Sequence, residues 1–200
     1  MDFMGTLSLI IASILWGVLH SILASHGFKA LVRRLLGDTA FERIYRLFYN
    51  LFASVSFIPV LAMLVAFPDL ALYSIPSPWV YATLVIQGLA ALALVAGVMQ
   101  TGPWEFIGLA QLSGPLKKES ALVTNGLYAR VRHPLYTAGL VFIWLTPEMT
   151  VNRLVLWSIF SLYIVIGAYF EERKLLKDFG EVYAAYKART PMLIPTLRKS

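Results

Sequence analysis

Residues 3–27, FMGTLSLIIASILWGVLHSILASHG, contain no Asp, Glu, Lys or Arg. The hydrocarbon core of a bilayer is about 30 Å thick, and about 20 apolar residues in a helix cross it. The run has no basic start and is longer than the apolar region of a signal peptide, so we expect it to persist as a helix. This stretch therefore predicts a transmembrane span.

The rest of the chain repeats this pattern of long runs without charge. The third run is long enough for a loop followed by a helix from about Trp79 to Met99, and the fourth is short. We expect the fourth helix either to begin before Leu135 or to end before it has crossed the bilayer. These later runs are Leu47 to Pro68, Leu70 to Trp104, Leu135 to Pro147 and Leu154 to Phe170, with a tight hairpin around Pro147 to Asn152.

Composition supports this interpretation and excludes several classes of protein. Of 200 residues, 58% are hydrophobic and 14% are charged, and mean hydropathy is +0.70. A soluble domain is about 25% charged. The absence of cysteine excludes disulfides, thiolate zinc sites and iron–sulfur clusters. With only three histidines in the chain, we expect no metal site. The net charge of +6 is typical of the loops of a membrane protein, so it does not indicate a nucleic-acid partner and we expect none. We predict one all-α integral-membrane domain over residues 1–200, with about five transmembrane helices.

Lysine and arginine indicate the orientation. Segments 28–46, 105–134 and 171–200 hold 5, 4 and 7 of the 17 basic residues, and Arg153 is the one left. Basic residues gather in cytoplasmic loops. We therefore expect the amino terminus outside and the carboxyl terminus in the cytoplasm, in a multi-pass protein of a bacterial inner membrane. Basic side chains such as Arg34 and Arg198 are also suited to simple contact with anionic membrane lipid.

Two further helices are expected at the membrane surface. From Phe28 to Leu36, apolar residues recur at helical spacing with basic residues between them, which is typical of an interfacial helix. Glu171 to Ala188 also has helical periodicity, with Gly180 as an interruption. Pro191 and Pro195 then end regular structure.

The stretch LVTNGLYARVRHPLY, residues 122–136, contains the first candidate site. Pro134 suits the first turn of a helix, where its missing N–H is not needed. The positive end of that helix, together with Arg132, favours a carboxylate or phosphate. Tyr136 follows Arg132 by one turn, on the same face. Taken alone, the stretch is also compatible with a snorkelling arginine and a histidine, His133, at the interface.

Glu171 and Glu172 form the second candidate site, at the cytoplasmic end of the last span. Adjacent residues on a helix point about 100° apart, so at most one of the two faces a pocket. We predict that Glu172 faces the pocket and Glu171 faces outward. A pair at the water line with Arg173 and Lys174 is the alternative.

Together these motifs resemble the isoprenylcysteine carboxyl methyltransferase family, which also includes phospholipid methyltransferases. The resemblance covers about Leu122 to Pro195. The amino-terminal half is similar, more loosely, to the methanethiol S-methyltransferase branch. The residues that carry the resemblance are Arg132-His133-Pro134-x-Tyr136, Glu171-Glu172, Leu175, Phe179-Gly180, Tyr183, Tyr186 and Pro191 to Pro195, and in the first half Leu19-His20-Ser21, Glu42-Arg43 and Trp104 to Gln111.

The resemblance implies a membrane methyltransferase that uses S-adenosylmethionine, with the cofactor bound by about residues 100–195. It implies His133, Glu172 and Arg132 as catalytic residues. A phospholipid or amine N-methyltransferase, and a non-catalytic membrane module with the same fold, are the alternatives. The cofactor-binding residues implied are Gln111, Tyr128, Arg132, His133, Pro134, Tyr136, Glu171, Glu172, Tyr183 and Tyr186.

The acceptor is expected to be a small or lipophilic molecule that arrives from the bilayer. Eukaryotic isoprenylcysteine enzymes carry an arginine about one turn before the carboxylate pair, where this chain has Gly167 to Phe170. This difference favours a thiol or amine over a carboxylate. A thiol reacts as thiolate, which His133, or His20 with Gln111, could promote. Residues Gly102 to Lys118 are expected either to cap the site or to be a plain connection.

Overall fold

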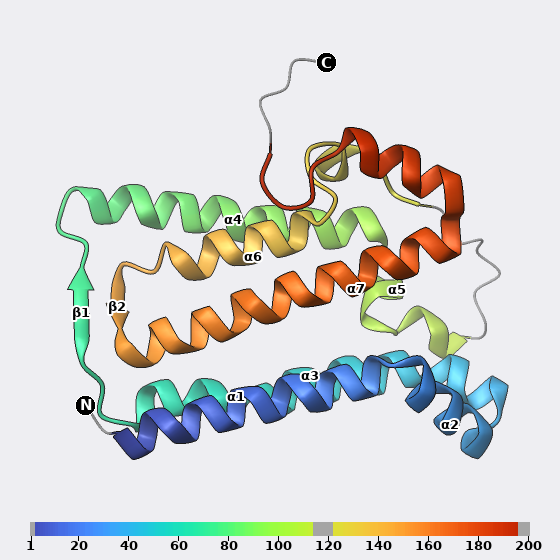
Figure 1. Cartoon of the computed structure of the whole chain (residues 1–200), viewed down its shortest axis with the longest axis horizontal. Helices are drawn as coiled ribbons and strands as arrows, with labels where there is room; N and C mark the ends of the chain where they lie inside the picture. Colours follow the sequence, from blue (N-terminus) through green and yellow to red (C-terminus); the bar gives the residue numbers. More distant parts are fainter. Residues whose placement is uncertain (1–2, 114–121, 196–200) are drawn as a thin grey trace. The chain divides into compact units, whose positions relative to one another are not determined.

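The computed structural model describes residues 3–113 and 122–195 (Figure 1). Most of the described residues are helical, which confirms the all-α prediction, and the two short strands pair with each other. The elements in chain order are α1 (Phe3–Ala24), α2 (His26–Leu36), α3 (Asp38–Ala66), β1 (Ala71–Ser74), α4 (Trp79–Thr101), α5 (Pro103–Ile107), η1 (Ala110–Ser113), η2 (Gly126–Ala129), α6 (Pro134–Trp144), β2 (Glu148–Thr150) and α7 (Val151–Arg189).

Among the described residues, four helices, α1, α3, α4 and α7, are by length and composition long and apolar enough to cross a membrane. At most 11% of the most apolar window of each is buried within the protein, so most of their apolar side chains are available to lipid. The expected fourth span is α6, which has 11 residues and begins at Pro134. It borrows no helical length from the preceding residues and stops short of membrane length.

The described chain divides into two compact units, and the first comprises residues 3–72, 102–113 and 150–159. In it α1 packs against α3 and α2. The indole N–H of Trp16 donates to the Ser56 hydroxyl at 3.1 Å. The Asn50 amide donates to the carbonyls of Phe106 and Ile107 at 2.8 and 2.9 Å, and these bonds hold α5 on α3.

The interfacial helix predicted from Phe28 to Leu36 corresponds to α2. The Ser25 hydroxyl caps it by accepting from the Phe28 N–H at 3.2 Å. No residue of α2 is buried, and Leu35 is 74% exposed. An amphipathic helix with apolar side chains left open suits the boundary between headgroups and acyl chains.

The second unit comprises residues 73–101, 122–149 and 160–195. Here α4 and α6 lie side by side, with Ala90 and Ala138 buried (Figure 1). They approach so closely at Gly97 that an added Cβ would lie 2.7 Å from the Leu135 side chain. Small residues permit such close packing of helices in a membrane.

The break predicted at Gly180 is confirmed within α7. Gly180 has φ 52° and ψ −128°, a backbone conformation open to glycine and costly for other residues. It redirects the helix beyond the apolar span. Residues 190–195, which we call the strap, have no regular structure, as the two prolines predict.

Candidate functional site

The first turn of α6 is anchored by the strap. Pro134 occupies the first helical position and His133 the preceding cap position. The backbone N–H groups of Arg132 and His133 donate to the carbonyls of Pro191 and Met192 at 2.8 and 3.1 Å. The Thr137 hydroxyl donates to the Leu193 carbonyl at 2.7 Å. The strap therefore accepts two backbone N–H groups next to the amino end of α6, the helix end where the sequence predicted an anion.

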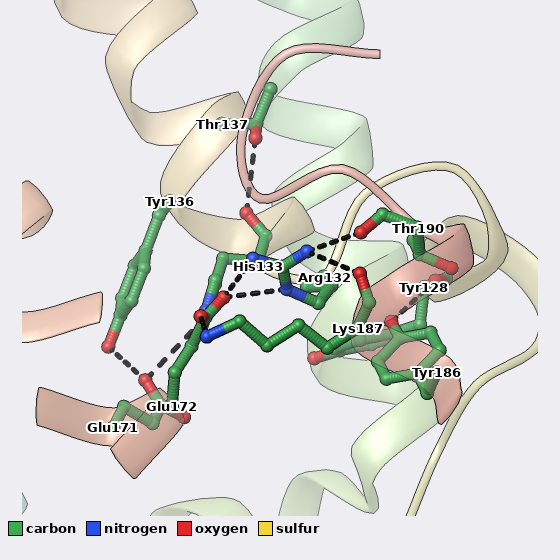
Figure 2. Close-up of polar contacts among 10 residues, drawn as sticks. All are labelled: Tyr128, Arg132, His133, Tyr136, Thr137, Glu171, Glu172, Tyr186, Lys187 and Thr190. Carbon is green, nitrogen blue, oxygen red and sulfur yellow. Dashed lines mark hydrogen bonds and ion pairs between the residues drawn. The ribbon is translucent and has the colours of Figure 1, made fainter. Parts of the chain in front are cut away.

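A buried ion pair connects this turn to α7 (Figure 2). The guanidinium of Arg132 donates from Nε and Nη2 to Oε1 of Glu172 at 2.6 and 2.5 Å. The ammonium of Lys187 lies 2.8 Å from the other carboxylate oxygen, Oε2. Glu172 is 5% exposed, so two cations compensate one buried charge.

His133 lies against both carboxylates. It is 6% exposed, and its Nε2 lies 3.4 Å from Glu172 Oε1 without making a hydrogen bond. Its Nδ1 lies 3.8 Å from Glu171 Oε2. Burial lowers the pKa of His133, and Arg132 adds to this, while Glu171 and Glu172 oppose it; the net shift is downward. The imidazole is therefore neutral at pH 7 and able to accept a proton.

Glu171 and Tyr136 form the exposed edge of the site. The Tyr136 hydroxyl donates to Glu171 Oε2 at 2.8 Å, and its ring stacks on His133 with centroids 5.3 Å apart. The Glu171 side chain is 45% exposed, in contrast to Glu172. Glu172 is thus the more buried of the two, but both carboxylates contact the same histidine, so the assignment of Glu172 alone to a pocket stays a prediction.

Three tyrosines complete the cluster in the second unit. The Tyr186 hydroxyl donates to the Tyr128 carbonyl at 2.6 Å, which fastens α7 to η2. Tyr183 is 1% exposed, and its hydroxyl makes no hydrogen bond to any residue that the structure describes. Burial raises the pKa of the Tyr128 hydroxyl, and the charge of Glu171 raises it further.

The structure brings together all but one of the predicted site residues. Gln111 belongs to the first unit, where its amide donates to the Glu105 carbonyl at 3.1 Å. Its role toward a cofactor stays a prediction. The loop expected to cap the site, Gly102 to Lys118, is described only to residue 113, so its end lies outside the described residues.

Sequence reasoning missed Lys187, Thr137 and Thr190. Lys187 is one of several basic residues in the carboxyl-terminal helix, and no motif distinguishes it. It lies 15 residues beyond Glu172, across the Gly180 break, so helical periodicity does not pair the two. Among the described residues no group of three or more His, Cys, Asp or Glu could hold a metal ion.

An apolar cavity of about 310 Å³ lies between α4 and α6. Its walls include Ala90, Ala93 and Ala138, and Val131 and Pro134 flank it close to His133. Arg130 and Thr137 are its polar lining residues. It could admit an apolar molecule and offers little to a polar one.

Comparison with known proteins identifies the family. The chain is 32% identical over 189 residues to methanethiol S-methyltransferase 1 of Bradyrhizobium diazoefficiens, covering 92% of this chain and 65% of that protein. It is 31% identical over 186 residues to the methanethiol S-methyltransferase of a Pseudomonas species, covering 90% of this chain and 70% of that one. The chain belongs to the methanethiol S-methyltransferase family.

The resemblance to the isoprenylcysteine family is confirmed at a greater distance. Over 89 residues, 40% of this chain and 35% of the relative, it is 38% identical to the protein-S-isoprenylcysteine O-methyltransferase of Schizosaccharomyces pombe. The likeness to the methanethiol branch is not confined to the amino-terminal half but extends over about nine tenths of the chain. The chain spans about two thirds of the length of these bacterial relatives. No family model and no solved structure matches it.

The donor set fits the methyl donor that this family implies. S-adenosylmethionine carries a sulfonium, an amine and a carboxylate. The half-exposed Glu171 carboxylate and the Tyr136 ring suit a cation. In this cluster, Nε2 of His133 and the hydroxyl of Tyr183 are buried and make no hydrogen bond to a described residue, as expected of a site that a polar ligand completes.

Proposed function

We propose that this protein is an integral-membrane methyltransferase that moves a methyl group from S-adenosylmethionine to a small thiol. One observation carries the proposal. A neutral, buried histidine lies between two carboxylates of different burial, which come directly after the charge-free run Leu154 to Phe170 of the membrane-length helix α7. Thiol acceptors are favoured because the relatives with the widest coverage are named for methanethiol.

Each residue of the cluster has a task in this proposal. Glu171 and the Tyr136 ring attract and orient the cationic end of the donor. When bound, S-adenosylmethionine supplies a methyl carbon on a positively charged sulfur, which becomes a neutral thioether when that carbon–sulfur bond breaks. The new bond forms to the acceptor sulfur. Methyl transfer is an in-line displacement, so alignment provides most of the rate enhancement.

His133 accounts for the proton in the same reaction. A thiol loses its proton when it is methylated, and a neutral imidazole can accept it. The resulting imidazolium would lie between Glu171 and Glu172, whose negative charges stabilise it. Arg132 and Lys187 keep Glu172 ionised, so that this stabilisation is present at neutral pH.

The apolar cavity supports an acceptor without polar groups. Its lining by alanine, valine and proline side chains suits a small alkyl thiol or the apolar end of a larger one. Such acceptors partition into a bilayer, so the cavity can be reached without crossing the aqueous phase.

Purified protein in detergent with methyl-tritiated S-adenosylmethionine tests the proposal. Methanethiol, a prenylcysteine and an amino lipid are supplied as separate acceptors. We expect label in the thiol product, a loss of at least about tenfold in Glu171→Gln, and no loss in Glu181→Gln, an exposed carboxylate further along α7. Label only in the lipid would favour the N-methyltransferase alternative. If no acceptor is labelled and calorimetry detects no donor binding, the enzyme proposal is wrong.

We also propose the orientation predicted from basic residues, with the carboxyl terminus and this cluster on the cytoplasmic side of a bacterial inner membrane. The donor is a cytoplasmic metabolite, so the opposite orientation would separate it from the site. Reporter fusions at Pro76 and after Ser200 should report opposite compartments. The same compartment for both would contradict the proposed topology.

A further inference from the structure

The Arg132–Glu172 pair has an unusual geometry. In many arginine–carboxylate pairs, two nitrogens face two oxygens as a parallel fork. Here Nε and Nη2 of Arg132 both contact Oε1 of Glu172, at 2.6 and 2.5 Å. The second oxygen, Oε2, is taken by Lys187 at 2.8 Å. The lysine therefore confines the guanidinium to one oxygen.

Because only Nε and Nη2 of Arg132 contact Glu172, the third guanidinium nitrogen, Nη1, can donate to other acceptors. Nη1 of Arg132 donates to the carbonyl of Lys187 at 3.2 Å and to that of Thr190. Both carbonyls lie at the carboxyl end of α7, where a helix has no N–H of its own to offer. Lys187 thus contacts the pair twice, with its ammonium on Glu172 and its backbone on Arg132.

We propose that Lys187 is a positioning residue of the methyl-transfer site, which acts through Glu172 and Arg132 rather than on a substrate. By occupying Oε2 it keeps Oε1 of Glu172 beside His133 and keeps Nη1 of Arg132 on the end of α7 and the start of the strap. The inference rests on the proposed function, because the site that it orders is the proposed active site.

Charge gives Lys187 a second effect on the same histidine. The groups that face His133 are Glu171 and Glu172 from α7, Arg132 from its own segment and the stacked Tyr136 ring, with Lys187 beyond Glu172. Without the ammonium, one cation instead of two compensates Glu172. The pKa of His133 then rises, so a smaller fraction of the imidazole is neutral and able to accept a proton at neutral pH.

The titration of His133 tests this in the full-length protein, in detergent micelles and without a donor. The chain has three histidines, so ¹³C labelling at the ring Cε1 gives three NMR signals, and His133→Gln identifies the relevant one. We expect Lys187→Gln to raise the titration midpoint of His133 by about half to one pH unit, the effect of losing one nearby charge. Lys187→Arg should restore it, and Lys177→Gln, an exposed lysine of the same helix, should leave it unchanged.

Methyl transfer supplies the second measurement. Lys187→Gln should lower kcat about tenfold with a smaller effect on KM for the donor, and the acid limb of the rate profile should move upward with the His133 midpoint. If Lys187→Gln does not fold, Lys187→Met keeps the aliphatic stem and removes the charge. An unchanged His133 midpoint in a folded neutral variant would overturn the inference. Wild-type protein that neither binds donor nor transfers methyl would instead overturn the proposed function, while the titration still decides the role of Lys187.

Discussion

Two histidines of this protein lie in contrasting surroundings. His133 precedes α6 and lies within 4 Å of two carboxylates. His20 lies within α1, where its Nε2 is hydrogen-bonded to the Tyr49 hydroxyl and its ring packs against Trp16 at 4.9 Å. The described charged cluster lies at the start of α6 and beyond the charge-free run of α7, whereas His20 belongs to a polar network of aromatic side chains within the apolar α1. Ionised side chains are costly within the hydrocarbon core, so the difference suggests where proton chemistry can occur.

The largest expected effect is at Glu172, the buried carboxylate of the charged cluster. Glu172→Gln leaves Arg132 and Lys187 without their anion, and breaking a buried ion pair costs about 3–5 kcal/mol. We expect both methyl transfer and thermal stability to fall, with activity reduced more than tenfold. Thermal unfolding of Glu171→Gln, measured beside it, should differ from wild type by less than about 0.5 kcal/mol because that side chain is half-exposed. Equal losses of stability in the two variants would remove the distinction between them.

Substitution of each histidine tests the comparison directly. His133→Gln should reduce methyl transfer at least about tenfold, because amides do not accept the proton that an imidazole accepts. His20→Phe should retain binding of S-adenosylhomocysteine measured by calorimetry, since its ring position can be filled by another aromatic side chain. If His20→Phe instead lost thiol methylation while binding was unchanged, the thiol would be activated from the α1 network, as the sequence allowed.

The pH dependence of stability tests the environment of His133. The pKa of His133 is lowered on folding, so the unfolded chain binds more protons below its ordinary value of 6.5. Stability from this group is therefore full above about pH 6.5 and declines as pH falls toward the folded pKa. Melting temperatures at pH 7.5 and 5.5 should differ more in wild type than in His133→Gln. An identical pH dependence in both proteins would count against a buried, neutral His133.

The smallest expected effect is at Thr137, which fastens the strap with one hydroxyl. Thr137→Val removes the bond to the Leu193 carbonyl and preserves the shape of the side chain. The expected loss is about 1 kcal/mol of stability. Activity should fall less than threefold, because the bonds from Arg132 and His133 to the strap remain. A loss as large as that of Glu172→Gln would show that the strap, and not the ion pair, holds the cluster together.

The sequence predicted those features that depend on local chemistry. Runs without charge located α1, α3 and α4, and Gly180 and the two prolines marked breaks that do not depend on distant residues. The angle between neighbours on a helix predicted that Glu171 and Glu172 differ in exposure, but it could not say which of the two is the buried one. The contacts of Lys187 and of the strap could not be predicted, because they join segments that only the folded chain brings together; Arg132 and Lys187, for example, are 55 positions apart along the chain. The pairing of β1 with β2 was also not predicted, because strands of four and three residues are too short to give a sequence pattern.

The brevity of α6 has a consequence for how the chain crosses the bilayer. Its 11 residues rise about 16 Å, against about 30 Å for the apolar part of α7. Of the six residues from Leu145 to Thr150, the last three form β2 and advance about 3.3 Å each, so they supply about 10 Å of the difference. The backbone of this connection is partly satisfied by bonds such as that from the Ile75 N–H to the Pro147 carbonyl, at 2.8 Å. The length of this connection therefore sets the position of His133 relative to Glu172. Deleting one residue would shift His133 by up to about 3 Å, which is comparable to the distance between the two side chains.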